Sequence, residues 1–248
     1  MSVGYLSEIV FENGLPADSY LHALPVVQHL RAQPHLAFDA SVTVLVGENG
    51  TGKSTLLEAI AVACGFNPEG GSRNFNFSTN DTHSALHESL RIVRRAYPKD
   101  GYFLRAESLY NVATNIEELD RMPGFLPPLV DSYGGRSLHK QSHGESFLAL
   151  VQNRLGGQGL YLFDEPEAAL PPMRQLTLLA EIDRLVKANS QLIIATHSPI
   201  LMAYPGARIL QLSEEGIAAV DYKQTEHYQI TKRFLDDPAR MLRYLIEE

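Results

Sequence analysis

The chain has 248 residues, 29 of them acidic and 21 basic, which gives a formal net charge of −8 at pH 7. This length suits one large domain with a full hydrophobic core, and the net acidity disfavours long-range attraction to nucleic acid. No apolar run approaches membrane-spanning length, and the N-terminus lacks the basic-then-apolar pattern of a secretion signal. The single cysteine, Cys64, excludes an internal disulfide framework. We therefore expect a cytoplasmic protein without membrane insertion.

The first part of the chain predicts three strands and a helix. Strands are expected over residues 5–11 and 35–38, with an irregular stretch over 13–35 between them. A third strand, over 42–46, is apolar enough to be buried in a parallel sheet. A helix pattern over 55–63 follows, and Gly65 is placed to end it.

A glycine-rich loop joins the third strand to this helix. Its sequence, GENGTGKST over 47–55, fits the phosphate-binding pattern G-x-x-x-x-G-K-[ST]. Lys53 would reach the β- and γ-phosphates, and the Ser54 hydroxyl would ligate Mg²⁺. A helix that begins near Lys53 would direct its positive end at the same phosphates. The predicted nucleotide-binding residues are Asn49, Gly50, Thr51, Gly52, Lys53, Ser54 and Thr55.

The composition changes over 66–140. Residues 66–80 are rich in Gly, Asn and Phe, which is typical of a loop, and a proline-containing break is expected over 123–128. The pattern predicts an amphipathic helix over 84–95, a strand over 102–109 and a helix over 110–121. The basic side of the first helix is either a solvated face or a contact for nucleic acid or an acidic partner; it comprises Arg91, Arg94, Arg95 and Lys99. We interpret 66–140 as an inserted helical subdomain within a single domain spanning 1–248.

A helix start at 141–146 carries two possible meanings. Ser142 and Glu145 form an S-x-x-E capping box, which is a sufficient structural reason for both residues. An exposed helix start with a serine hydroxyl and a glycine, Gly144, also suits phosphate binding. The spacing of these residues does not separate the two interpretations.

Two further strands end in polar residues. The apolar run 159–163 ends in Asp164 and Glu165, and a parallel strand would deliver both carboxylates at its carboxyl end, where open α/β sheets bind ligands. Asp164 can hold Mg²⁺, and Glu165 can orient or deprotonate an attacking water. A helix over 171–188 precedes a strand over 191–195, and His197 follows that strand, where it could touch a γ-phosphate. A hairpin over 207–222 and one or two helices over 225–247 complete the chain.

These elements together resemble the ATP-binding cassette ATPases. The resemblance covers about residues 40–212 and is greatest to the non-transport branch, which includes the RecF and structural-maintenance-of-chromosomes heads and small predicted AAA-family ATPases. It implies an α/β P-loop NTPase fold, with a mixed sheet flanked by helices, and Mg²⁺-dependent hydrolysis of ATP. In that family the loop over 47–55 would be the Walker A motif and Asp164 with Glu165 the Walker B pair. Ser142, Gly144 and Glu145 would be the signature, and His197 the switch histidine.

The resemblance also implies how copies of the chain would associate. In the family, the signature of one subunit contacts the ATP held by the other, so a homodimer is expected on ATP binding, with hydrolysis releasing it. Work in DNA repair, chromosome maintenance or defence, together with a protein partner, is compatible with this branch. Nucleic acid remains an open alternative.

Three departures from the family pattern are visible. His143 and Gln141 replace the first glycine and the usual leading apolar residue of the signature. No glutamine-containing lid motif is evident between residues 65 and 100. Residues 169–172, ALPP, lack the usual aspartate of the dimer-communication loop. We expect intact nucleotide binding with slow or partner-dependent turnover.

Two alternatives stay open. A transporter's nucleotide-binding subunit would share the Walker motifs and the switch histidine, although the absent lid glutamine and the 66–140 region count against it. A small-molecule kinase would use the phosphate loop but would need neither the signature helix nor His197.

Overall fold

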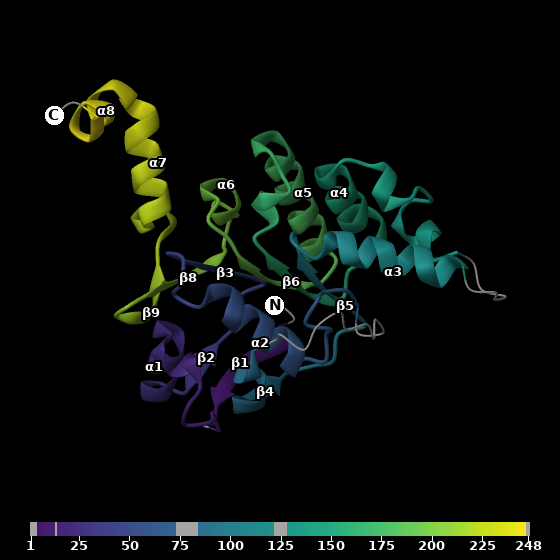
Figure 1. Ribbon diagram of the computed structural model, residues 1–248, viewed down its shortest axis with the longest axis horizontal. Coiled ribbons are helices and arrows are strands. Elements are labelled where there is room, and N and C mark those ends of the chain that lie inside the picture. Colours follow the sequence, from purple (N-terminus) through teal and green to yellow (C-terminus); the bar gives the residue numbers. More distant parts are fainter. Residues whose placement is uncertain (1–3, 13, 73–83, 122–127, 247–248) are drawn as a thin grey trace.

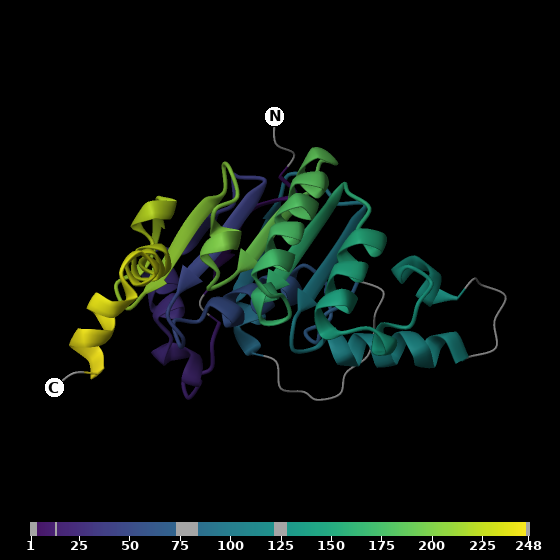
Figure 2. The same ribbon diagram turned by 90° about the horizontal axis from the view of Figure 1, so that it is seen from above.

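The computed structural model describes residues 4–12, 14–72, 84–121 and 128–246. Within them, two β-sheets enclose one helix, and further helices cover the outer face of the larger sheet (Figure 1). A pair of C-terminal helices projects away from these layers (Figures 1 and 2). None of the helices in the described part of the chain is long and apolar enough to cross a membrane.

The larger sheet has six strands, and five of them are parallel. Their order is β5 (Asp100–Arg105), β6 (Gly159–Asp164), β7 (Gln191–Ala195), β3 (Val42–Gly47), β8 (Arg208–Ser213) and β9 (Gly216–Val220). Only β9 runs antiparallel, as the second strand of a hairpin with β8. β3, β6 and β7 are buried along their whole length because helices or strands cover both faces of the sheet. Because these strands are parallel, their carboxyl ends lie at the same edge of the sheet, where the loops of open α/β sheets bind ligands.

The smaller sheet is antiparallel, with the order β2 (His35–Ala37), β1 (Leu6–Phe11) and β4 (Leu90–Arg94). A buried side chain, Gln191 of β7, ties it to the larger sheet. The Gln191 Oε1 accepts from the backbone N–H groups of Tyr5 and Leu6, each over 2.8 Å, and its Nε2 donates to the carbonyl oxygens of Leu6 and Phe38. All the hydrogen-bonding capacity of this amide is used, so the two sheets are held in one relative position.

Helix α2 (Lys53–Ala63) lies between the two sheets (Figure 1). Its Leu56, Leu57 and Ile60 belong to one apolar cluster with residues of β1 and of the larger sheet. The opposite face of the larger sheet is covered by α3 (Leu109–Arg121), α4 (His143–Arg154), α5 (Pro172–Lys187) and α6 (Pro199–Met202), which form a second cluster with it. Helix α1 (Pro25–Ala32) packs beside β8 and β9. Short 3₁₀ turns occupy Tyr20–Ala23, Ala85–Ser89, Leu129–Tyr133, Leu138–Lys140, Pro166–Ala168 and Tyr222–Gln224.

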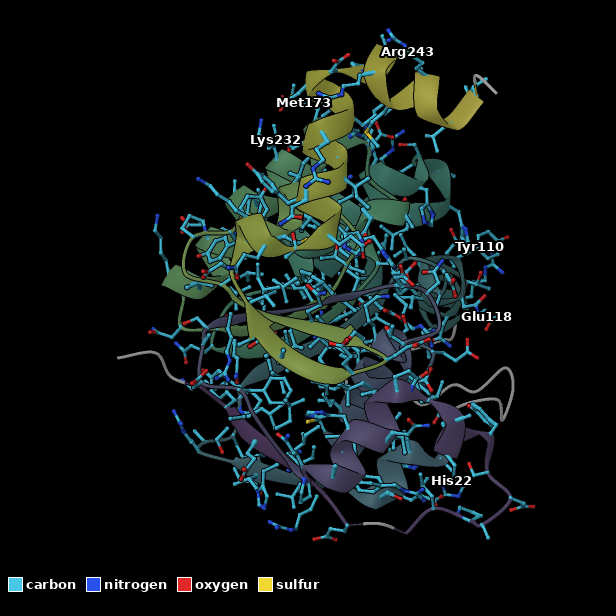
Figure 3. All side chains as sticks on the ribbon, turned by 90° about the vertical axis from the view of Figure 1, so that its left-hand side faces the viewer. His22, Tyr110, Glu118, Met173, Lys232 and Arg243 are labelled. Atoms are coloured by element: carbon cyan, nitrogen blue, oxygen red, sulfur yellow. The ribbon has the colours of Figure 1, made fainter. Side chains whose placement is uncertain are left out.

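The C-terminal arm consists of α7 (Glu226–Asp236) and α8 (Pro238–Ile246). A buried N-cap, Thr225, anchors its beginning: the hydroxyl donates to the Tyr222 carbonyl and accepts from the Tyr228 N–H. Beyond this cap, α7 has no buried residue. Figure 3 shows Lys232 and Arg243 along the arm, away from the sheets.

Several predicted elements are confirmed, and two are wrong. The strands, the helix after the phosphate loop and the C-terminal helices lie where the patterns place them, to within a few residues. The predicted amphipathic helix over 84–95 is instead a 3₁₀ turn followed by β4, because this segment pairs with β1 along the edge of the smaller sheet. The stretch over 13–35, predicted to be irregular, contains α1.

The interpretation of 66–140 as an inserted helical subdomain stays a prediction. Within that range, β4 belongs to the smaller sheet and β5 to the larger one. Its helical part begins at α3 and continues into the 3₁₀ turns at Leu129–Tyr133 and Leu138–Lys140. Most of the loop predicted over 66–80 and of the break over 123–128 lies outside the described residues.

Candidate nucleotide site

Three adjacent parallel strands bring most of the predicted site residues together. The phosphate loop follows β3, Glu165 follows β6, and His197 lies two residues beyond β7; β7 pairs with both of the other strands. A cleft of about 510 Å³ opens at this edge, lined by Glu48, Asn49, Glu165, His197 and His227. Residues far apart in sequence thus face one open space.

The phosphate loop has the backbone that the motif requires. Gly52 has φ +95°, and a Cβ there would lie 2.4 Å from the Cγ1 of Val26, so any larger residue would be strained and would have to displace the Val26 side chain. Helix α2 begins at the next residue, Lys53, which points its free N–H groups at the loop. The buried Lys53 ammonium donates to the carbonyl oxygens of Gly47 and Glu48, each over 2.8 Å. Burial lowers the pKa of Lys53, opposed by the carboxylates of Glu165 and Asp164.

Asp164 is a buried carboxylate at the end of β6. Burial raises its pKa to about 6, and the neighbouring Arg105 guanidinium and a hydrogen bond with the Ser54 side chain act in the opposite direction. The Nε of Arg105 lies 3.5 Å from its Oδ2, while the Nη1 of Arg105 bonds Glu58 over 2.7 Å. The other oxygen, Oδ1, is buried and has no hydrogen-bond partner among the described residues.

The Asp164 carboxylate and the neighbouring Ser54 hydroxyl fit a magnesium ion. Within the described residues no three or more His, Cys, Asp or Glu side chains gather as a closed metal cage. Mg²⁺ does not need one, because it is usually held by one or two protein oxygens, by waters and by substrate phosphates. The unpartnered Asp164 Oδ1 and the adjacent Ser54 hydroxyl supply oxygens of this kind.

Glu165 has a left-handed backbone, with φ 46° and ψ 51°. A residue with a Cβ rarely adopts this conformation, and such residues concentrate at functional sites. The turn directs Glu165 into the cleft rather than into the core, with 40% of its side chain exposed, whereas Asp164 retains only 7%. Its Oε1 lies 3.8 Å from the Nε2 of His197. The two neighbouring carboxylates therefore have different environments, as different chemical roles require.

His197 is held from two sides. Glu167 accepts from the Thr196 hydroxyl over 2.7 Å and from the backbone N–H of His197, which fixes the loop after β7. On the ring, Nδ1 lies 2.9 Å from the Nε2 of His227, the second residue of α7. The Nε2 of His197 is buried and makes no hydrogen bond to the described residues. Burial, followed by the positive charge of Lys53, lowers the His197 pKa, so the ring is neutral at pH 7.

The predicted signature residues form the exposed start of α4. The Ser142 hydroxyl accepts from the Glu145 backbone N–H, and the Ser142 backbone N–H donates to the Glu145 carboxylate, which completes the capping box. Arg174 of α5 bonds both side chains, each over 3.3 Å. Gly144 is buried beneath them, where a Cβ would lie 2.7 Å from the Ala169 carbonyl oxygen. This helix start lies beside the segment that follows Glu165, at the same edge of the sheet.

Four residues at this edge were not among the predicted site residues. Arg105 ends β5, and Glu107 follows it closely enough for its charge to raise the Asp164 pKa. Both residues lie beside Asp164 because β5 pairs with β6. Glu167 follows the Asp-Glu pair closely, so its position was a usable signal. His227 had none, because its helix lies outside every motif.

Known proteins are similar to the chain in sequence and in fold. Residues 26–117 match the family model described as an AAA domain. An uncharacterized ABC transporter ATP-binding protein of Haemophilus influenzae is 36% identical over 81 residues, or 32% of this chain. That match spans 31% of the relative, so the chain covers about a third of its length.

Solved structures of cassettes share the fold at low identity. The cbiO1 protein of Clostridium perfringens, part of the ABC transporter complex cbiONQ, superposes with a TM-score of 0.51 at 18% identity, covering 98% of this chain and 100% of that one. Another ATP-binding cassette of an ABC transporter gives 0.52 at 15% identity, over 97% and 98% of the two chains. The chain therefore has the fold of the ATP-binding cassettes, and its residues 26–117 match the AAA-domain model.

Proposed function

We propose that the chain is a Mg²⁺-dependent ATPase in which two copies close around two ATP molecules. The observation that carries this proposal is the convergence of Lys53, Asp164, Glu165 and His197 at the carboxyl ends of three adjacent parallel strands. The positive residue lies at a helix start, the buried carboxylate lies beside a hydroxyl, and the second carboxylate faces an open cleft. This set supports binding of a nucleoside triphosphate and attack by water.

Each side chain has a role in the proposed reaction. Lys53 and the N–H groups of the loop bind the β- and γ-phosphates, while Ser54 and Asp164 hold Mg²⁺, which neutralises phosphate charge when bound. Glu165 orients the attacking water and takes its proton, since it is the carboxylate that opens to the cleft. His197 donates from Nε2 to the γ-phosphate, which makes it sensitive to whether that phosphate is present.

The dimer is proposed from the position of the signature. Ser142 and Glu145 are exposed, and α4 starts at the edge of the sheet that carries the nucleotide site. A helix start is a ready anion site, and here it faces outward, where a second copy could present its ATP. A cytoplasmic location and a role in DNA repair, chromosome maintenance or defence belong to the same proposal.

The test is the Glu165→Gln variant. It keeps the side chain's size but removes the base, so ATP hydrolysis should fall by about 10²–10⁴-fold while ATP binding persists. Light scattering with ATP and Mg²⁺ should then show a stable dimer, and ADP should not produce it. If this variant remains monomeric with ATP, the proposed ATP-dependent dimer is wrong. If its hydrolysis is undiminished, Glu165 is not the catalytic base.

A transporter subunit is the second candidate, favoured by one observation. The Haemophilus influenzae relative bears the name of an ABC transporter ATP-binding protein, and its match covers 81 residues. This candidate predicts a stable complex with an integral membrane protein. Purification from detergent-solubilised membranes of the native cell, compared with the soluble fraction, separates the two candidates.

A further inference from the structure

We propose that His227, on the first turn of the C-terminal arm, is a positioning residue that holds His197 in the form able to donate to a phosphate. The proposal rests on the function proposed above for His197. It concerns the contact between His197 Nδ1 and His227 Nε2, which are 2.9 Å apart with ring centroids separated by 5.1 Å. The contact joins the loop after β7 to a helix outside the catalytic motifs.

The direction of this hydrogen bond follows from the other nitrogen of His197. The acceptor facing His197 Nε2 is a carboxylate, because Glu165 Oε1 lies 3.8 Å away. A phosphate oxygen is likewise an acceptor only. Both therefore favour the tautomer of His197 that carries its proton on Nε2.

With the proton on Nε2, the Nδ1 of His197 can only accept. The Nε2 of His227 must then be the donor, which also fixes the tautomer of His227. Both rings are neutral at pH 7: burial lowers both pKa values, and the positive charge of Lys53 adds to this effect on each. A neutral ring needs such a partner, since without it the proton is free to occupy either nitrogen.

His227 is itself held in place by the start of α7. The buried Thr225 caps the helix two residues earlier, through bonds to Tyr222 and Tyr228. The ring lines the same cleft as Glu165 and His197. The arm therefore contributes a side chain to the nucleotide site, although its far end, α8, projects away from the sheets (Figure 1).

Three substitutions at this position separate a hydrogen-bond role from a packing role. His227→Phe keeps an aromatic ring but has no donor. His227→Gln places an amide N–H near the position of Nε2, and His227→Glu offers only an acceptor when ionised. Lys232→Gln is the matched control, since Lys232 lies on the same helix and pairs with Asp236 four residues further along it.

The first measurement is the tautomer itself, read from nitrogen spectra of protein labelled with ¹⁵N-histidine. We expect His197 to carry its proton on Nε2 and to have a bare Nδ1, with signals assigned by the His197→Ala and His227→Gln variants. His227→Glu should move the His197 proton to Nδ1 or protonate both nitrogens. A wild-type spectrum with the proton on His197 Nδ1 would overturn the proposal, whatever the fate of the ATPase activity.

The second measurement is the ratio of the affinities for a non-hydrolysable ATP analogue and for ADP. Loss of one charge-assisted hydrogen bond to the γ-phosphate should lower this ratio about tenfold in His227→Phe. The ratio should recover in His227→Gln and stay unchanged in Lys232→Gln. An unchanged ratio in His227→Phe, alongside a lowered ratio in His197→Ala, would remove His227 and leave His197 in its role. An unchanged ratio in His197→Ala would instead refute the γ-phosphate contact in the proposed function, and the spectra would still decide the hydrogen bond.

Discussion

The Nζ of Lys53 lies 2.8 Å from the carbonyl oxygen of Gly47, so a backbone oxygen of the phosphate loop holds the ammonium group in place. Replacing Lys53 by Met keeps the length of the stem and removes the charge. ATP affinity should fall about 10–100-fold, the value of one or two charge-assisted hydrogen bonds. Titration calorimetry with a non-hydrolysable analogue measures it. Lys99→Met, on an exposed residue, is the control and should bind normally.

The raised pKa of Asp164 predicts a pH dependence of stability in metal-free protein. A carboxyl with a pKa of about 6 when folded binds its proton more tightly than in the unfolded chain, so stability falls as pH rises from about 4 to about 6. Asp164→Asn should therefore stabilise the protein at pH 7, by at most about 3 kcal/mol, and not at pH 4.

Urea unfolding in EDTA at both pH values tests this sign. Asp183→Asn is a control of the opposite kind. A hydrogen bond from Lys187 lowers the pKa of Asp183, so this carboxylate contributes its stability at neutral pH and loses it in acid. A stabilising effect of Asp164→Asn that is equal at pH 4 and pH 7 would exclude titration of Asp164 as the cause.

The left-handed backbone of Glu165 is strained, so this residue should lower the free energy of unfolding while serving the proposed hydrolysis. Glu165→Gly should raise the free energy of unfolding by about 1 kcal/mol, because glycine adopts this conformation without strain. It should also abolish hydrolysis. Gln158→Gly is the matched control: Gln158 is an exposed non-glycine residue with φ 50° that precedes β6, at the opposite end of that strand from Glu165. It should gain stability and keep its activity; a loss of stability in Glu165→Gly would contradict the strain argument.

Gly144 and Gly156 predict opposite results for the same substitution. A Cβ at Gly144 would meet the Ala169 carbonyl at 2.7 Å and the Nη1 of Arg174 at 2.9 Å. The backbone oxygen has little freedom to move, so Gly144→Ala should destabilise by about 1–3 kcal/mol. Gly156 has nothing within 4 Å and no positive φ. Gly156→Ala should stabilise by up to about 1 kcal/mol, and thermal melts of the two variants should move in opposite directions.

The sequence was most informative where chemistry is local. The phosphate loop, the Asp164–Glu165 pair and the Ser142–Glu145 capping box are each encoded within a few residues, so their elements and local geometry could be predicted. The order of the strands could not, because pairing joins segments that are far apart in the chain. The neighbours of Asp164 depend on that order: Arg105 reaches it only because β5 pairs with β6.

Two further positions show why pattern alone was insufficient. Residues 84–95 have helical spacing of apolar residues, yet β1 recruits part of this segment as a strand, so tertiary pairing outweighs the local preference. His227 lies on a helix with no buried residue, and its contact with His197 exists because the chain returns to the sheet edge after β9. Neither periodicity nor motif spacing carries that information.

The saturated amide of Gln191 has a mechanical consequence. Sliding the smaller sheet by one residue along β7 would leave the N–H groups of Tyr5 and Leu6 without partners in a dry interior, at a cost of about 1–3 kcal/mol for each group. The hydrogen bonds of Gln191 therefore oppose any sliding of one sheet past the other. A movement in a nucleotide cycle that slid the two sheets past each other would carry this cost, whereas a movement of the arm would not, because α7 has no buried residue.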